Sequence, residues 1–236
     1  ILLLLDMKSL LGLRPCSRAF LRMVTEELKD HMEQVVTPFV PKPRAFLDHL
    51  PSVEGYIGGS AAIPFFVRDA CYRANALEVF VPFHTVLEFG RHLTRVQQAR
   101  EEDDFGSDDD FVDYLPHRAS RSVTRYRTPA GVVVLICGCF MDPLAPIACA
   151  WSSLHVCYAN PDYFGHGYPR LTMERRGLIG DGIGEENEVC ARMRRMRKRG
   201  FDLRASPRAW PEYATLAPCA ARRFACHTQP RNFLDE

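Results

Sequence analysis

The sequence has no long hydrophobic run. Its most apolar segment, residues 1–5, is followed by Asp6 and Lys8, whereas a membrane-spanning helix needs about 20 mostly apolar residues in a row. The segment also lacks the basic start and the small-residue cleavage site of a secretory signal peptide. We therefore expect no transmembrane segment, no secretory signal and no membrane partner.

An excess of charge of either sign is also missing. Thirty Lys and Arg residues stand against 29 Asp and Glu residues, so the formal net charge is +1 at pH 7. This balance excludes a globally basic nucleic-acid coat and an acidic solvating tail. Hydrophobic residues make up 47% of the 236 positions and charged residues 25%, which is typical of a globular protein and not of a disordered chain.

Closely paired cysteines of the zinc-finger type are absent. The nine cysteines are odd in number and scattered through apolar stretches, which favours reduced thiols in an intracellular protein, cytoplasmic or nuclear, over a disulfide framework. We interpret Cys137 and Cys139 as small buried groups on a strand. Cys219, Cys226 and His227 include zinc-type ligands, but their spacing fits no C-x₂-C pattern.

The first part of the chain is predicted to be helical. Apolar residues recur at helical spacing over residues 17–36, which indicates an amphipathic helix. Pro38, Pro41 and Pro43 then predict an extended connector, because proline fixes its own φ and restricts the residue before it. A short helix over 44–50 follows. We assign residues 1–44 to a helical N-terminal extension.

The middle of the chain, residues 45–180, contains the predicted strands. Tyr56 and Ile57 lead through a glycine turn into a helix over 61–67, and residues 77–81 form the next strand. A helix over 85–98, an acidic solvated loop over 101–113 and a hairpin with strands at 122–127 and 132–139 follow. The second hairpin strand is apolar on both faces and therefore central. The pattern predicts an α+β fold with a mixed sheet and flanking helices.

Beyond the hairpin, we expect a helix over 146–158 and a loop rich in Gly, Pro and aromatic residues. The last part, residues 181–236, is predicted to hold a basic helix over 185–199 and an irregular C-terminal extension, because residues 206–236 are rich in Pro and Arg and only weakly periodic.

The glycine turn is the first candidate site. Gly58, Gly59 and Ser60 lie between a predicted strand and a predicted helix. Glycine lets the backbone approach a phosphate closely, and the free N–H groups at a helix N-terminus favour negative charge. The turn is neither a G-x-G-x-x-G fingerprint nor a Walker loop with its lysine. A tight turn that needs small residues for structural reasons is the alternative.

The surroundings of this turn resemble a known family. A strand, Gly-Gly-Ser, a helix and then the strand Ala-Leu-Glu-Val-Phe-Val over 76–81 resemble the nucleotidyltransferases of the polymerase beta superfamily. The stretch 56–172, with Trp-Ser-Ser-Leu-His-Val at 151–156 and Tyr-Pro-Arg-Leu-Thr at 168–172, is similar to uncharacterised nucleotidyltransferase-like proteins of mushroom-forming fungi. The resemblance implies a nucleotidyltransferase-like palm, with a nucleoside triphosphate held at Gly59 and Ser60 and metal ions held by acids on the following strands.

The metal-binding acids that the resemblance implies are incomplete. Glu78 matches the second acid of the pair, but Ala76 stands at the first position, and the strand 132–136 carries no carboxylate. Two-metal catalysis needs two or three hard oxygen ligands to hold Mg²⁺ and to orient the attack. We therefore expect a pseudoenzyme that binds no cofactor, and that binds a nucleotide or a macromolecular partner.

Two alternatives stay open. The first is a Mg²⁺-dependent nucleotidyltransferase that acts on RNA, protein or a small acceptor, with Glu78 as its catalytic and metal-binding residue. The second is a protein-interaction scaffold of the same fold.

Two further groups of residues are candidate sites. Ser152, Ser153 and His155 lie too close in sequence to be aimed at one another as nucleophile and base, so we interpret them as packing groups of a helix. The predicted helix 185–199 carries the strongest basic cluster, which is either a solvated face or a surface for RNA, protein or nucleotide phosphate. Its candidate contact residues are Arg192, Arg194, Arg195 and Arg197.

Overall fold

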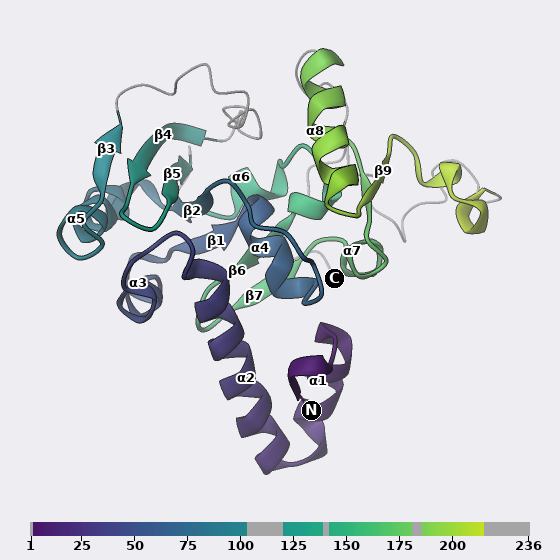
Figure 1. The fold of residues 1–236 in the computed structure, drawn as a ribbon, viewed down its shortest axis with the longest axis horizontal. Coiled ribbons are helices and arrows are strands. Elements are labelled where there is room, and N and C mark those ends of the chain that lie inside the picture. Colours follow the sequence, from purple (N-terminus) through teal and green to yellow (C-terminus); the bar gives the residue numbers. More distant parts are fainter. Residues whose placement is uncertain (1, 103–119, 139–141, 181–185, 215–236) are drawn as a thin grey trace.

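A computed structural model describes residues 2–102, 120–138, 142–180 and 186–214, and a mixed seven-stranded sheet lies at its centre (Figure 1). The sheet order is β3-β4-β5-β2-β1-β6-β7. Strand β2 runs parallel to β5, and the other neighbouring pairs are antiparallel. The expected α+β fold with a mixed sheet and flanking helices is therefore confirmed. The strands are β1 Tyr56–Gly58, β2 Leu77–Val81, β3 Arg100–Glu102, β4 Ser120–Arg127, β5 Val132–Gly138, β6 Cys157–Ala159 and β7 Phe164–His166.

Helices cover the sheet and extend the fold at both ends of the described chain. The α-helices are α1 Met7–Leu13, α2 Arg18–Val36, α3 Pro43–His49, α4 Gly59–Phe66, α5 Val86–Arg95, α6 Ala145–Ala148, α7 Pro169–Met173 and α8 Glu186–Lys198. Short 3₁₀ turns lie at Leu2–Leu4, Arg14–Cys16, Pro51–Val53, Phe83–Thr85, Ser153–His155, Pro207–Ala209 and Pro211–Tyr213. None of the helices in these ranges is long and apolar enough to cross a membrane.

The predicted N-terminal helix is confirmed as α2. Its N-cap, Ser17, accepts a hydrogen bond from the backbone N–H of Phe20 at 3.1 Å, which satisfies one of the free donors at the helix start. The helix packs against α4, where the ring of His31 stacks on Phe65 at 5.8 Å. The Nε2–H of His31 also donates to the carbonyl of Pro64 at 3.0 Å, so α2 is bonded to the helix that begins at the glycine turn.

A buried glutamine fixes the proline-rich connector. The Gln97 side chain is fully buried, and its amide accepts from the backbone N–H of Lys42 at 3.0 Å and donates to the Lys42 carbonyl at 3.2 Å. The same NH₂ group donates to Nε2 of His92 at 3.2 Å, which requires a neutral imidazole there. Burial lowers the pKa of His92 to about 4, with the neighbouring His49 as a second cause.

The prediction of one helix over 146–158 is wrong. The structure has α6, a 3₁₀ turn at Ser153–His155 and then strand β6. Hydrogen bonds to distant segments replace the helical ones: the Trp151 carbonyl accepts from Gly180 N–H at 3.0 Å, and the Ser153 hydroxyl accepts from Leu178 N–H at 2.8 Å. Serine side chains compete with helical hydrogen bonding in this way. The spacing of apolar residues along the sequence gives no sign of this competition.

The prediction of an acidic loop over 101–113 is wrong at its first two residues. Glu101 and Glu102 belong to strand β3, and Glu102 forms an ion pair with Arg125 of β4 at 2.7 Å. Residues 103–113 lie outside the described residues. The predicted strand 77–81, the hairpin and the helix after residue 185 are confirmed as β2, β4–β5 and α8.

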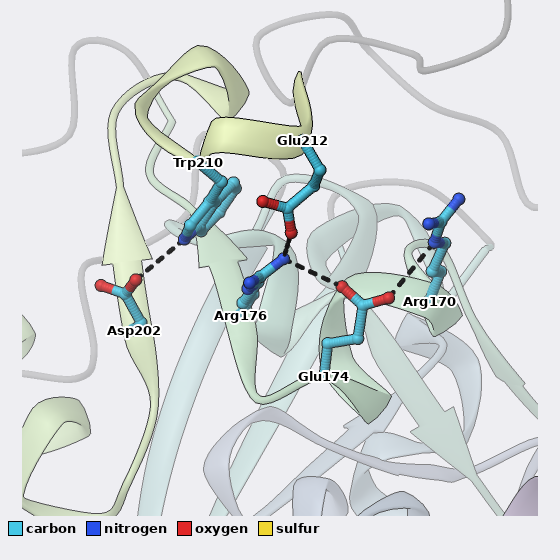
Figure 2. Close-up of polar contacts among 6 residues, drawn as sticks. All are labelled: Arg170, Glu174, Arg176, Asp202, Trp210 and Glu212. Atoms are coloured by element: carbon cyan, nitrogen blue, oxygen red, sulfur yellow. Dashed lines mark hydrogen bonds and ion pairs between the residues drawn. The ribbon is translucent and has the colours of Figure 1, made fainter. Parts of the chain in front are cut away.

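A second small sheet holds the segment after α8. Strand β8, Arg176–Leu178, pairs in parallel with β9, Asp202–Arg204. Figure 2 shows the polar contacts around it: Nε1–H of Trp210 donates to Asp202 at 2.8 Å, and Arg176 bonds to Glu212 and, at 3.2 Å, to Glu174. The segment up to Tyr213 is therefore held against the body by specific contacts.

Candidate functional site

The glycine turn forms as predicted, and both of its glycines are needed for packing. Gly58 ends β1 and Gly59 begins α4 with φ = +60°. A Cβ at position 58 would lie 2.7 Å from the Phe80 ring. Gly59 adopts the left-handed conformation that strains other L-residues. The structural requirement for glycine at this turn is thus independent of any ligand.

The Glu78 carboxylate lies directly on this turn. Gly58 and Glu78 are register partners in β1 and β2, and a Cβ at Gly59 would fall on the Glu78 carboxyl group. Glu78 is 7% exposed. A helix N-terminus favours an anion, and here the protein's own carboxylate supplies it. A phosphate that approached Gly59 would meet this negative charge.

The Ser60 side chain is part of a buried polar network. Ser60 is 3% exposed, and its hydroxyl lies 3.1 Å from Nε2 of His155. The guanidinium of Arg199 donates to the same hydroxyl at 3.4 Å. On the other side of the imidazole, the Ser152 hydroxyl lies 2.7 Å from Nδ1 of His155. The hydroxyl expected at a nucleotide is therefore bonded within the protein.

A proline explains a further contact at this turn. Pro64 lies inside α4 and has no N–H to bond the carbonyl four residues earlier, which belongs to Ser60. The Tyr72 hydroxyl donates to that carbonyl at 3.0 Å instead. The segment after α4 is in this way fixed to the first turn of the helix.

The structure brings Ser60 and His155 together from positions 95 residues apart. A Ser–His contact is the pairing used by nucleophilic enzymes. Here the serine, the imidazole and Ser152 are all buried, and the Trp151 ring lies 4.9 Å from the imidazole. The burial of all three side chains favours a packing role. The expectation that Ser152 and His155 lie too close in sequence to be aimed at one another is wrong, because the 3₁₀ turn at Ser153–His155 brings the two side chains within hydrogen-bond distance.

The donors beside Glu78 do not fit a two-metal site. Ala76 lies in an apolar cluster with Phe80 and Val134, so these three described positions near the carboxylate offer no side-chain oxygen ligand. Burial raises the pKa of the nearby Cys157 thiol well above its ordinary value, and Glu78 raises it further, so the thiol stays protonated. Among the residues described, no group of three His, Cys, Asp or Glu side chains is placed to hold a metal ion.

The basic helix α8 divides into an inner and an outer side. Arg194 and Arg197 are exposed, but Arg192 is 1% exposed and its guanidinium lies 5.7 Å from the centre of the Trp151 ring. The interpretation of Arg192 as a contact residue for RNA or protein is therefore wrong. The guanidinium in this position interacts with the face of the aromatic ring through its positive charge and its planar shape.

The cysteine candidates fall outside the described side chains. Cys137 is in β5, but its side chain is not described, and Cys139, Cys219, Cys226 and His227 lie outside the described residues. Nothing about their interpretation as buried groups or zinc ligands follows from the structure.

Three comparisons with known proteins complete the description of the site. None gave a match. Neither the protein-family models, nor the curated proteins, nor the solved structures include one significantly similar to this chain. The assignment of a function therefore depends on the geometry of the turn and of α8.

Proposed function

We propose that this chain is a non-catalytic, nucleotidyltransferase-like binding protein whose glycine turn has become a structural element. The Glu78 carboxylate against Gly59 is the observation that carries the proposal. It supports the resemblance, because an acid of the strand after the turn faces the glycine loop. It also argues against nucleotide transfer, because that acid occupies the place of the phosphate.

The order of the strands supports the same proposal. Strand β1 leads through the turn into α4 and pairs antiparallel with β2, which pairs parallel with β5. The acids of a two-metal centre would project from β2 and β5. Val134, the register partner of Glu78 on β5, is fully buried and apolar, so this position supplies no third ligand of the kind that the resemblance implies.

The Ser60 network supports the loss of nucleotide binding at the turn. To reach a triphosphate, the Ser60 hydroxyl would have to leave both His155 and Arg199. Breaking a buried hydrogen bond costs about 1–3 kcal/mol for each group left unsatisfied. In a Mg²⁺-dependent nucleotidyltransferase, binding of the triphosphate at Ser60 would carry this free-energy cost, and the metal ligands would still be missing.

A transfer assay tests the proposal. The chain is incubated with each of the four α-labelled nucleoside triphosphates, with Mg²⁺ or Mn²⁺, and with an RNA oligonucleotide or the protein itself as acceptor. We expect no labelled product above that of a heat-treated control. Transfer that disappears in Glu78→Gln would establish the enzyme alternative. Transfer that persists in Glu78→Gln would place catalysis at another site and would equally contradict the proposal.

A further inference from the structure

A basic cavity lies at the C-terminal end of α8, next to the polar network of the glycine turn. Its volume is about 490 Å³, within the range of small-molecule sites. Tyr72, which bonds the Ser60 carbonyl, forms part of its wall. The cationic side chains that line it are Arg175, Arg195, Lys198 and Arg199.

From this cavity we infer a binding site for a small phosphorylated molecule, held by Lys198 and Arg199 with Arg195 beside them. The inference goes beyond the proposed function, because it concerns a different surface from the glycine turn and does not depend on the loss of catalysis. The lining holds one carboxylate, Asp69. Arg175 pairs with it at 2.8 Å, so that charge is already compensated.

Arg199 is held in place by two neighbours and keeps N–H donors that the described residues do not use. Its guanidinium lies 4.6 Å from the centre of the Tyr72 ring, and its Nη1 donates to Ser60. An arginine carries five N–H donors. Within the part of the chain that the structure describes, the hydrogen bonds of Arg199 use Nη1 alone, so Nε and Nη2 are left for a ligand. A planar guanidinium fixed by an aromatic ring is well suited to phosphate.

The end of α8 does not need these cations as caps. The backbone N–H groups of Gly200 and Phe201 bond the carbonyls of Arg197 and Met196 at 3.0 Å each, and Gly200 has φ = +87°. This is the Schellman arrangement, which satisfies the last carbonyls of a helix without side chains. Lys198, in the same turn, is exposed and makes no hydrogen bond or ion pair with the described residues.

Cys71 offers a direct readout, because it lines the cavity and is exposed. We would measure its rate of alkylation by iodoacetamide, peptide by peptide, in increasing inorganic pyrophosphate, with sodium chloride at equal ionic strength as the salt control. Exposed Cys16 and Cys190 are not part of the cavity lining and serve as internal controls. We expect pyrophosphate to slow alkylation of Cys71 and to leave the two controls unchanged.

A matched pair of variants locates the site. Lys198→Gln removes a lining cation, and Arg197→Gln removes an exposed cation of the same helix turn that does not line the cavity. We expect Lys198→Gln to raise the pyrophosphate concentration for half-protection about tenfold, the loss of one charge-assisted hydrogen bond. Arg197→Gln should change it less than about twofold.

Three results would overturn the inference. The first is no protection of Cys71 by pyrophosphate beyond that of sodium chloride. The second is equal weakening by the two variants, which would indicate diffuse attraction to a basic helix. The third is protection by a single-stranded RNA oligonucleotide that pyrophosphate does not displace, which would assign the surface to nucleic acid. Parallel titrations with ADP and with inorganic phosphate distinguish a nucleotide from a free phosphate ion as the ligand.

Discussion

Replacing Gly59 by alanine is the sharpest test of how the glycine turn is built. The new Cβ would carry two costs. The left-handed conformation, φ = +60°, costs an L-residue about 1–2 kcal/mol. The Cβ would also fall on the Glu78 carboxyl group, and forcing atoms into a packed site typically costs about 1–3 kcal/mol. We therefore expect Gly59→Ala to destabilise the protein by about 3 kcal/mol.

A second substitution separates the two costs. In a Glu78→Ala background the carboxyl group is gone, so Gly59→Ala should cost only the conformational part, about 1 kcal/mol. The difference between the two backgrounds is the coupling energy of the pair, expected near 2 kcal/mol. Urea unfolding followed by circular dichroism measures each variant, and a loss of 3 kcal/mol moves the midpoint by about 1 M or more.

Gly12→Ala is the matched control. Gly12 lies in α1, and an added Cβ meets nothing within 4 Å, so alanine should stabilise the helix by about 0.5–1 kcal/mol. The reasoning is refuted if Gly59→Ala costs the same with and without the Glu78 carboxyl group. It is also refuted if Gly59→Ala costs no more than a few tenths of a kcal/mol.

The remaining predictions concern the network around this turn and the fold beside it. Because the folded-state pKa of His92 is about 4, below its unfolded value of about 6.5, the unfolded chain binds the proton more tightly between these values. The free energy of unfolding should then fall by about 1–2 kcal/mol as the pH is lowered from 6.5 to 4, after allowance for the partial solvent exposure of His92. In urea unfolding at a series of pH values, His92→Gln should remove this pH-dependent loss of stability. Arg192→Ala should destabilise by about 2–3 kcal/mol and shift tryptophan fluorescence, while exposed Arg194→Ala stays within about 0.5 kcal/mol; equal effects would contradict the burial of Arg192. Tyr72→Phe should cost about 1 kcal/mol, and clearly less in a Pro64→Ala background, where the restored N–H bonds the same carbonyl; an unchanged cost in thermal unfolding would refute that account.

Local signals in the sequence were sufficient for several elements. The β4–β5 hairpin follows from its apolar strand and its turn, where the Thr128 hydroxyl accepts from the N–H groups of Ala130 and Gly131 at 3.0 Å each. The strand, glycine turn and helix at Tyr56–Phe66 follow in the same way, because glycine and the change from period two to helical period lie within a few residues.

Contacts between distant segments could not be read from the sequence. The break of the predicted helix at Ser152 depends on partners near Leu178 and Gly180. The Ser60–His155 pair joins two residues that are 95 positions apart in the sequence. The burial of Arg192 had one signal: Arg192 and Met196 are four residues apart on α8, so the arginine lies on the face that is buried. A count of the charged residues in α8 does not distinguish this buried face from the exposed one.

The central claim is that Glu78 holds the place of a phosphate at the glycine turn. A crystal structure of the chain grown with ATP and Mn²⁺ tests it most directly. The account predicts density for the Glu78 carboxylate against Gly59 and for the Ser60 hydroxyl at His155, with neither phosphate nor Mn²⁺ at the turn, whatever occupies the cavity at Lys198. A triphosphate at Gly59 and Ser60, with Mn²⁺ bound to Glu78, would contradict it.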